Sequence, residues 1–164
     1  MIPAAEEAAK WGRVGVLGTA GTVASQSFPK EIKKLNRNAK IFQNSAPMLV
    51  PLAEGGETTG AEPFIKKYLK PFAGKKIGAL VLGCTHYPIF KKQIKKALGN
   101  KTRIVSQDEI VPPKLKNYLA RHPEIEKQLS KNRTAKILGT DETETIDKLA
   151  QKWFGGVKPK LISL

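Results

Sequence analysis

Cysteine is nearly absent from this chain of 164 residues, and its one cysteine, Cys84, cannot form a disulfide within the chain. Such sparse use suits a reducing compartment. The sequence also lacks an apolar run long enough to cross a membrane, and its first residues include acidic side chains where a signal peptide would be apolar. We therefore expect a cytoplasmic protein with no membrane partner.

Acidic residues are scarce as well, with 14 against 29 basic residues, which gives a net charge of +15. A positive excess of this size could bind nucleic acid or another anionic surface. The lysines, however, lie in pairs along helical patterns, for example Lys66–Lys67 and Lys95–Lys96, and aromatic residues do not alternate with them to stack on bases. Nucleic-acid binding is therefore only a minor alternative, and the charge could instead attract an anionic small molecule.

The fingerprint of a dinucleotide-binding turn is missing too. Glycines stand at positions 12, 15, 18 and 21, but the fingerprint needs two glycines separated by a single residue. What remains is a predicted strand from Arg13 to Gly18 and a turn that contains Thr19 and Thr22. These threonines either cap the next helix or offer hydroxyls to a substrate carboxylate at its amino end.

Short apolar segments alternate with amphipathic ones along the chain. Strands are predicted at 13–18, 40–44, 77–82, 102–105, 135–139 and 160–164, and helices at 3–11, 29–35, 62–70, 88–98 and 141–154. A helix-rich stretch after residue 106 is expected to be interrupted at Pro112–Pro113 and at Pro123. This alternation indicates an α/β fold, in three layers around a mainly parallel sheet.

The most informative stretch is residues 75–88, with the sequence KKIGALVLGCTHYP. Its apolar strand stops at Gly83, and Cys84, Thr85 and His86 follow directly before a helical pattern that begins at Pro88. Open α/β sheets bind ligands at the carboxyl ends of their strands. A cysteine there is either a small buried hydrophobic residue or a reactive thiol. The helix amino end and the nearby imidazole favour the thiolate, which can act as an acid, base or nucleophile.

Three segments resemble glutamate racemase, in the aspartate/glutamate racemase superfamily: L-G-C-T-H-Y-P at 82–88, G-T-x-G-T at 18–22 and V-P-L-x-E at 50–54. The first is similar to that family's second-cysteine motif. The resemblance implies interconversion of L- and D-glutamate by two cysteine thiols, one from each of two similar domains, that face opposite sides of the α-carbon. It implies no metal, no pyridoxal phosphate and no other cofactor.

The resemblance also assigns roles to residues of this chain. Cys84 is implied to be the thiol on one face of the substrate. Glu54, which by residue type alone would be an exposed loop carboxylate, is implied to orient or charge the catalytic His86. The implied substrate-binding residues are Thr19, Thr22, Thr85 and His86.

The other half of the family's pattern is missing, because neither D-S-G-x-G-G nor C-N-T occurs in the sequence. The resemblance therefore covers only the carboxyl-terminal part of such an enzyme. Residues 1–12 would be a lead-in helix, residues 13–106 the second domain with the second cysteine, and residues 107–164 a segment that completes the missing first domain. On this interpretation, an apolar helix face in the last segment is left uncovered.

The expected function is thus a glutamate racemase that lacks its first-cysteine half, is inactive alone, and in complete form supplies D-glutamate for peptidoglycan in a bacterial cytoplasm. The expected partners are glutamate and either the missing amino-terminal half or further copies of the chain. The alternative is a non-catalytic binding or regulatory fragment of the same family.

Overall fold

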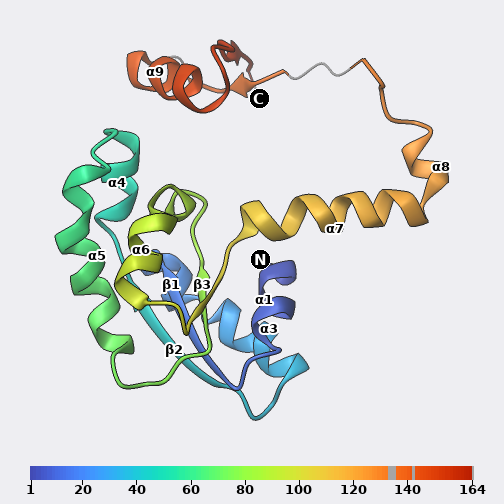
Figure 1. Ribbon diagram of the computed structural model, residues 1–164. Helices are drawn as coiled ribbons and strands as arrows, with labels where there is room; N and C mark the ends of the chain where they lie inside the picture. Colours follow the sequence, from blue (N-terminus) through green and yellow to red (C-terminus); the bar gives the residue numbers. More distant parts are fainter. Residues whose placement is uncertain (133–135, 142, 164) are drawn as a thin grey trace. The chain divides into compact units, whose positions relative to one another are not determined.

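A computed structural model describes residues 1–132, 136–141 and 143–163 (Figure 1). The chain divides into two compact units, residues 1–121 and residues 122–164. The domain boundary expected at residue 106 concerns how the chain would fit into a larger enzyme, so it stays a prediction.

The first unit alternates strands with helices, as the sequence predicts. Its strands are β1 (Arg13–Gly18), β2 (Lys40–Ser45), β3 (Ala79–Leu82) and β4 (Arg103–Val105). Its α-helices are α1 (Ile2–Ala8), α2 (Ala20–Ala24), α3 (Ser27–Leu35), α4 (Leu49–Glu54), α5 (Glu62–Leu69), α6 (Lys91–Leu98) and α7 (Gln107–Arg121). Its short 3₁₀ helices are η1 (Thr59–Ala61), η2 (Lys70–Phe72) and η3 (Tyr87–Phe90).

The four strands form one parallel sheet in the order β2-β1-β3-β4. In its register, Gly18 lies opposite Ser45 and Leu17 lies opposite Leu82. The carboxyl ends of β1, β2 and β3 therefore meet at one edge of the sheet. The expected α/β fold with a parallel sheet is confirmed.

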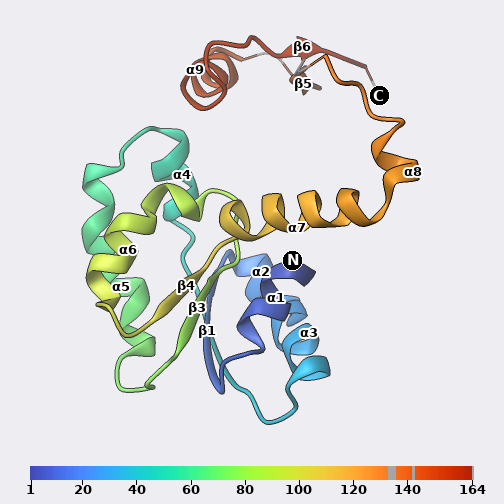
Figure 2. The ribbon, with the colours of Figure 1, turned by 45° about the vertical axis from the view of Figure 1, so that its right-hand side comes forward.

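Helices cover both faces of this sheet, which makes three layers (Figures 1 and 2). Val14 and Val16 of β1 and Val81 of β3 pack in the layer that contains α1 and α3. Leu17 and Leu80 point to the opposite face and pack in the layer of α4, α5 and α6. Each of these strands contributes to both clusters, because successive side chains of a strand alternate between its faces.

The structure corrects the helix that was expected to begin at Pro88. The four residues after the Cys84 turn form η3, and α6 begins only at Lys91. In a 3₁₀ helix, side chains three residues apart lie above one another, so Tyr87 and Phe90 both enter the core, where each is 0% exposed. Deep burial of this pair thus accounts for the tighter turn. Cys84 was expected to lie at the amino end of an α-helix, but it precedes a 3₁₀ helix instead.

The expected interruption at Pro112–Pro113 is also wrong, since α7 runs through both prolines. Proline lacks the N–H that would bond to the carbonyl four residues earlier. Those carbonyls belong to Asp108 and Glu109, which lie at exposed positions, where water can replace the missing donors. The expected interruption at Pro123 is confirmed, because α7 ends at Arg121.

The second unit contains α8 (Pro123–Glu126), α9 (Glu144–Trp153) and the short parallel pair β5 (Leu138–Gly139) and β6 (Lys160–Leu161). The Thr143 hydroxyl caps α9 by accepting a hydrogen bond from the Ile146 N–H at 3.2 Å. These elements are shorter than the segments predicted at 135–139, 141–154 and 160–164, and residues 135, 142 and 164 of those predictions lie outside the described residues. Within the part of the chain that the structure describes, no helix is long and apolar enough to cross a membrane.

Candidate active site

Cys84 lies at the carboxyl edge of the sheet, two residues beyond the end of β3. The Gly83 N–H donates to the Leu17 carbonyl at 2.8 Å, so β1 still guides the chain at this point. A Cβ atom on Gly83 would lie 3.0 Å from Phe28 Cε2 and 3.2 Å from the Leu17 oxygen. Glycine is therefore needed here because the backbone passes close to both α3 and β1, and this approach fixes where Cys84 emerges.

Thr19 and Thr22 lie beside the same turn. Thr19 is the N-cap of α2, where its Oγ1 accepts a hydrogen bond from the Thr22 N–H at 3.1 Å. The two hydroxyl oxygens are 2.9 Å apart, and Thr22 Oγ1 donates to the Gly83 carbonyl at 3.4 Å. The threonines thus cap α2 and tie its first turn to the peptide before Cys84, while their role toward a substrate stays a prediction.

A chain of three side chains leads away from the thiol. Cys84 Sγ lies 3.7 Å from His86 Nδ1, and His86 Nε2 lies 3.1 Å from Glu54 Oε1. Glu54 is the last residue of α4, and its side chain is 46% exposed. The structure therefore brings Cys84, His86 and Glu54 together from two distant segments, while their roles in catalysis stay a prediction.

The hydrogen-bond chain restricts where protons can sit. An ionised carboxylate can only accept hydrogen bonds, so the His86 nitrogen that faces Glu54 carries a hydrogen. In the neutral ring, Nδ1 is then free of hydrogen and can accept the thiol proton of Cys84. Glu54 would also stabilise the imidazolium that results, an arrangement in which a base activates a nucleophile and a third group orients the base.

Tyr87 anchors this turn to the sheet, a contact that sequence reasoning missed. Its hydroxyl lies 2.9 Å from the Gly18 carbonyl and 2.9 Å from the Ala46 carbonyl, at the ends of β1 and β2. Burial raises the pKa of Tyr87 above its ordinary value, so the phenol stays protonated. No local sequence pattern indicates this contact, because the partners are backbone atoms far along the chain.

The thiol faces a pocket of about 380 Å³. Cys84, the exposed Thr85 and Pro88 form one wall, and the first two turns of α7 form the other, including Gln107 and Val111. Thr85 is therefore placed at the mouth of the pocket that Cys84 lines. Sequence reasoning missed that α7 forms one wall of this pocket, although polar residues directly after a parallel strand indicated it.

A charged cluster holds α7 at this pocket. Lys91 Nζ lies 2.6 Å from Asp108 Oδ2 and 2.9 Å from Glu109 Oε1, and the buried Ser106 hydroxyl donates to Asp108. Burial opposes the charge on Asp108, but the hydrogen bonds from Lys91 and Ser106 outweigh it and hold the pKa of that carboxyl below its usual value. Burial likewise opposes the charge on Lys91, but its two carboxylate partners raise the pKa of the ammonium group. The cluster therefore remains charged near neutral pH and fixes one wall of the pocket.

The chemistry that this arrangement offers is acid–base transfer at sulfur. A thiol with an imidazole and a carboxylate behind it can accept or donate a proton at a carbon held in the pocket. Among residues 1–132, 136–141 and 143–163, no group of three or more His, Cys, Asp or Glu side chains is placed to hold a metal ion.

Comparison with known proteins gives a consistent result. Residues 1–110 match the family model of Asp/Glu/Hydantoin racemase. Glutamate racemase 1 of Caldanaerobacter subterraneus subsp. tengcongensis is 38% identical over 154 residues, which cover 91% of this chain and 56% of that protein. This chain thus spans little more than half the length of that relative.

Solved structures are also similar. The glutamate racemase of Bacillus anthracis matches with a TM-score of 0.85 and 30% identity, over 99% of this chain and 63% of that one. The glutamate racemase of Francisella tularensis in complex with D-glutamate matches with a TM-score of 0.84 and 26% identity, over 98% of this chain and 61% of that one.

Proposed function

Since this chain belongs to the Asp/Glu/Hydantoin racemase family, we propose that it supplies one of the two acid–base groups of a glutamate racemase. The observation that carries the proposal is the path from Cys84 through His86 to Glu54, with distances of 3.7 Å and 3.1 Å. That path ends at a pocket of about 380 Å³ that is open to a small molecule.

In the proposed reaction, the Cys84 thiolate takes the proton from the α-carbon of glutamate, and the electron pair of the C–H bond stays on carbon. A thiol on the opposite face returns a proton to that carbon and becomes a thiolate. The configuration is inverted, and the two sulfur atoms have exchanged protonation states. Acid–base catalysis at carbon needs a positioned group that takes up and releases a proton, and His86 Nδ1, 3.7 Å from Cys84 Sγ, is a partner for that proton.

The neighbouring residues of the chain have supporting roles in the proposal. His86 accepts the thiol proton at Nδ1 to form the thiolate, and Glu54 holds His86 in the required orientation. Thr85 donates a hydrogen bond to a substrate carboxylate at the pocket mouth, where a preorganised donor stabilises negative charge that spreads from the α-carbon. Thr19 and Thr22 support the backbone from which Cys84 projects.

The second acid–base group would come from a part of the protein that this chain does not contain. In support, Val111, Leu115 and Tyr118 lie along one face of α7 and are all exposed. Together with Pro3 of α1 they line a groove of about 670 Å³. An apolar helix face of this kind is typical of an interface, so we assign it to an amino-terminal half or to a second copy of the chain. The complete enzyme would supply D-glutamate for the cell wall in a bacterial cytoplasm.

The alternative is a binding module that no longer catalyses. It is favoured by the single cysteine among these 164 residues, because one thiol cannot serve both faces of the carbon. Such a module would bind glutamate and leave its α-proton in place.

The test is proton exchange by the isolated chain in heavy water. With one thiol present, we expect the α-proton signal of one glutamate enantiomer to decay by NMR while the configuration is retained. Cys84→Ala is the control and should bind glutamate without exchange. Binding without exchange by the unmodified chain would favour the module instead, and a Cys84→Ala variant that still exchanges would contradict the proposal.

A further inference from the structure

The positive charge of this protein is concentrated on one edge of its first unit. Residues 1–121 carry 21 of the 29 basic residues and 8 of the 14 acidic ones. Because all four strands are parallel, their amino ends share the edge opposite Cys84. Arg13 begins β1, Lys40 begins β2, Arg103 begins β4, and Lys75–Lys76 lie shortly before β3. Each strand therefore brings a basic residue to this edge.

The helices add to the same edge, since helices that connect parallel strands run back to the strands' amino ends (Figures 1 and 2). The last turns carry Lys33–Lys34 in α3, Lys66–Lys67 in α5 and Lys95–Lys96 in α6. Lysines at helix carboxyl ends interact favourably with the helix dipole, which explains part of the pattern without a ligand. We call this surface, formed by the amino ends of β1–β4 and the carboxyl ends of α3, α5 and α6, the basic edge.

Few acidic side chains neutralise the basic edge. Lys66 pairs with Glu62 at 2.8 Å, Lys34 with Glu31 at 2.6 Å, and Arg103 with Glu109 at 3.9 Å. For four other lysines of the edge, the described part of the chain provides no carboxylate at ion-pair distance. These lysines are Lys67, Lys70, Lys76 and Lys101. Each is exposed, so their charges are available to an anionic partner.

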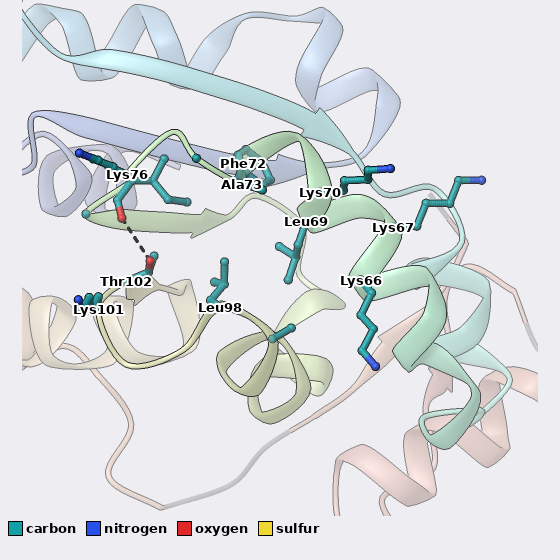
Figure 3. A pocket seen from close by; sticks show the side chains of 14 residues that line it. Lys66, Lys67, Leu69, Lys70, Phe72, Ala73, Lys76, Leu98, Lys101 and Thr102 are labelled. Carbon is teal, nitrogen blue, oxygen red and sulfur yellow. Dashed lines mark hydrogen bonds between the residues drawn. The ribbon is translucent and has the colours of Figure 1, made fainter.

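Apolar side chains lie among these lysines. Figure 3 shows Leu69, Phe72 and Leu98 between Lys70 on one side and Lys101 on the other, in a pocket of about 980 Å³. An apolar floor between two cationic walls suits a ligand that is both anionic and apolar. The residues that line this pocket include no arginine, and the one aromatic residue among them, Phe72, is only 4% exposed, whereas a nucleic-acid groove would present exposed aromatic rings or arginines to the bases.

Two further apolar residues are exposed at the basic edge. Trp11, at the turn into β1, is 36% exposed, and Leu35, the last residue of α3, is 61% exposed. The Trp11 ring lies over Gly78, where a Cβ atom would come within 2.6 Å of Trp11 Cε3, so the ring is fixed at the edge. Tryptophan at the rim of a lysine-rich surface is typical of contact with lipid head groups.

We propose that the basic edge binds the surface of a bilayer that contains anionic phospholipids, and that Trp11 and Leu35 enter the head-group region. This differs from the expectation from sequence that the chain has no membrane partner, which rested on the lack of a spanning segment. Surface attachment needs no spanning helix. The chain's 24 lysines and 5 arginines also favour diffuse attraction to a charged surface over the bidentate base contacts that arginine makes.

The experiment is sedimentation of the full chain with vesicles of phosphatidylglycerol and phosphatidylcholine at equal amounts, with pure phosphatidylcholine vesicles as the lipid control. We expect binding to the anionic vesicles only, and release as salt is raised to about 0.5 M. A lysine near an anionic surface contributes about 1 kcal/mol. A variant with Gln at 67, 70, 76 and 101 should therefore bind about a hundredfold to a thousandfold more weakly.

A matched variant separates the basic edge from total charge. It carries Gln in place of four exposed lysines elsewhere, Lys92, Lys116, Lys127 and Lys136, and should keep most of the binding. In a Trp153→Phe background, Trp11 fluorescence should shift to shorter wavelength on anionic vesicles. Equal loss in the two charge variants, an unchanged Trp11 spectrum, or tighter binding to duplex DNA than to vesicles at 0.15 M salt would overturn the proposal.

Discussion

Tyr87→Phe removes one oxygen atom from the anchor of the Cys84 turn, and its cost can be worked out from the structure. The side chain is 0% exposed, and its hydroxyl lies 2.9 Å from the carbonyls of Gly18 and Ala46. Both carbonyls keep a backbone donor after the substitution, because the Ala46 N–H bonds to Gly18 at 2.9 Å and the Leu49 N–H bonds to Ala46 at 3.1 Å. No acceptor is left unpaired, so the free energy of unfolding should fall by about 1 kcal/mol, the net contribution of one hydrogen bond.

Urea unfolding at pH 7, followed by circular dichroism, measures this change. Tyr68→Phe is the control, since among the described residues the Tyr68 hydroxyl has no hydrogen-bond partner, and it should shift the free energy by less than about 0.5 kcal/mol. A loss above about 3 kcal/mol for Tyr87→Phe would mean that the carbonyls are left unpaired after all. No loss at all would mean that the anchor does not form.

The pH dependence of the free energy of unfolding, compared between wild type and Tyr87→Phe, gives a second readout. Burial raises the pKa of Tyr87 in the folded state above its ordinary value, so the folded protein retains a proton that the unfolded chain releases above about pH 10. The stabilisation is complete below that pH and is lost as the pH rises further, with a slope of about 1.4 kcal/mol per pH unit. The difference between wild type and Tyr87→Phe should therefore shrink above pH 10, and a constant difference would contradict this assignment.

Three further experiments test the site. Gly83→Ala forces a Cβ atom to within 3.0 Å of Phe28 and should cost about 1–3 kcal/mol of stability, together with slower alkylation of Cys84 by iodoacetamide; unchanged values would refute the close approach. A double-mutant cycle with Lys91→Gln and Asp108→Asn should give a coupling energy of about 0.5–1 kcal/mol, reduced because the pair is partly exposed; coupling near zero at low salt would show that the pair does not hold α7. Glu54→Gln keeps a hydrogen-bond acceptor but removes the charge, so proton exchange should slow about tenfold or more with stability unchanged; unaltered exchange would remove Glu54 from the mechanism.

The parallel sheet could be predicted because its strands are local apolar runs. Arg13–Gly18 was predicted with the same bounds as β1, and the position of Cys84 at a strand's carboxyl end followed from the run that precedes it. The prediction that Glu54 lies near His86 depended on the resemblance to glutamate racemase, since no periodicity connects residues so far apart.

Contacts that depend on tertiary packing could not be predicted. The 3₁₀ turn at Tyr87 exists because two aromatic rings must enter one core, and Pro88 alone fits either helix type. From sequence alone, proline at 112 and 113 predicts a break in the helix. The helix α7 continues nonetheless, because water can bond to the exposed carbonyls that lack an N–H donor. The pocket wall from α7 also depends on the Lys91–Asp108 pair, which joins two segments through side chains alone.

The role of Cys84 is tested most directly by mixing this chain with the amino-terminal half of its 38% identical relative from Caldanaerobacter and following L-glutamate by chiral chromatography. We expect D-glutamate to form only in the mixture, and Cys84→Ala in this chain to abolish its formation. D-glutamate formed at an undiminished rate with Cys84→Ala would contradict the claim that this sulfur atom carries the proton.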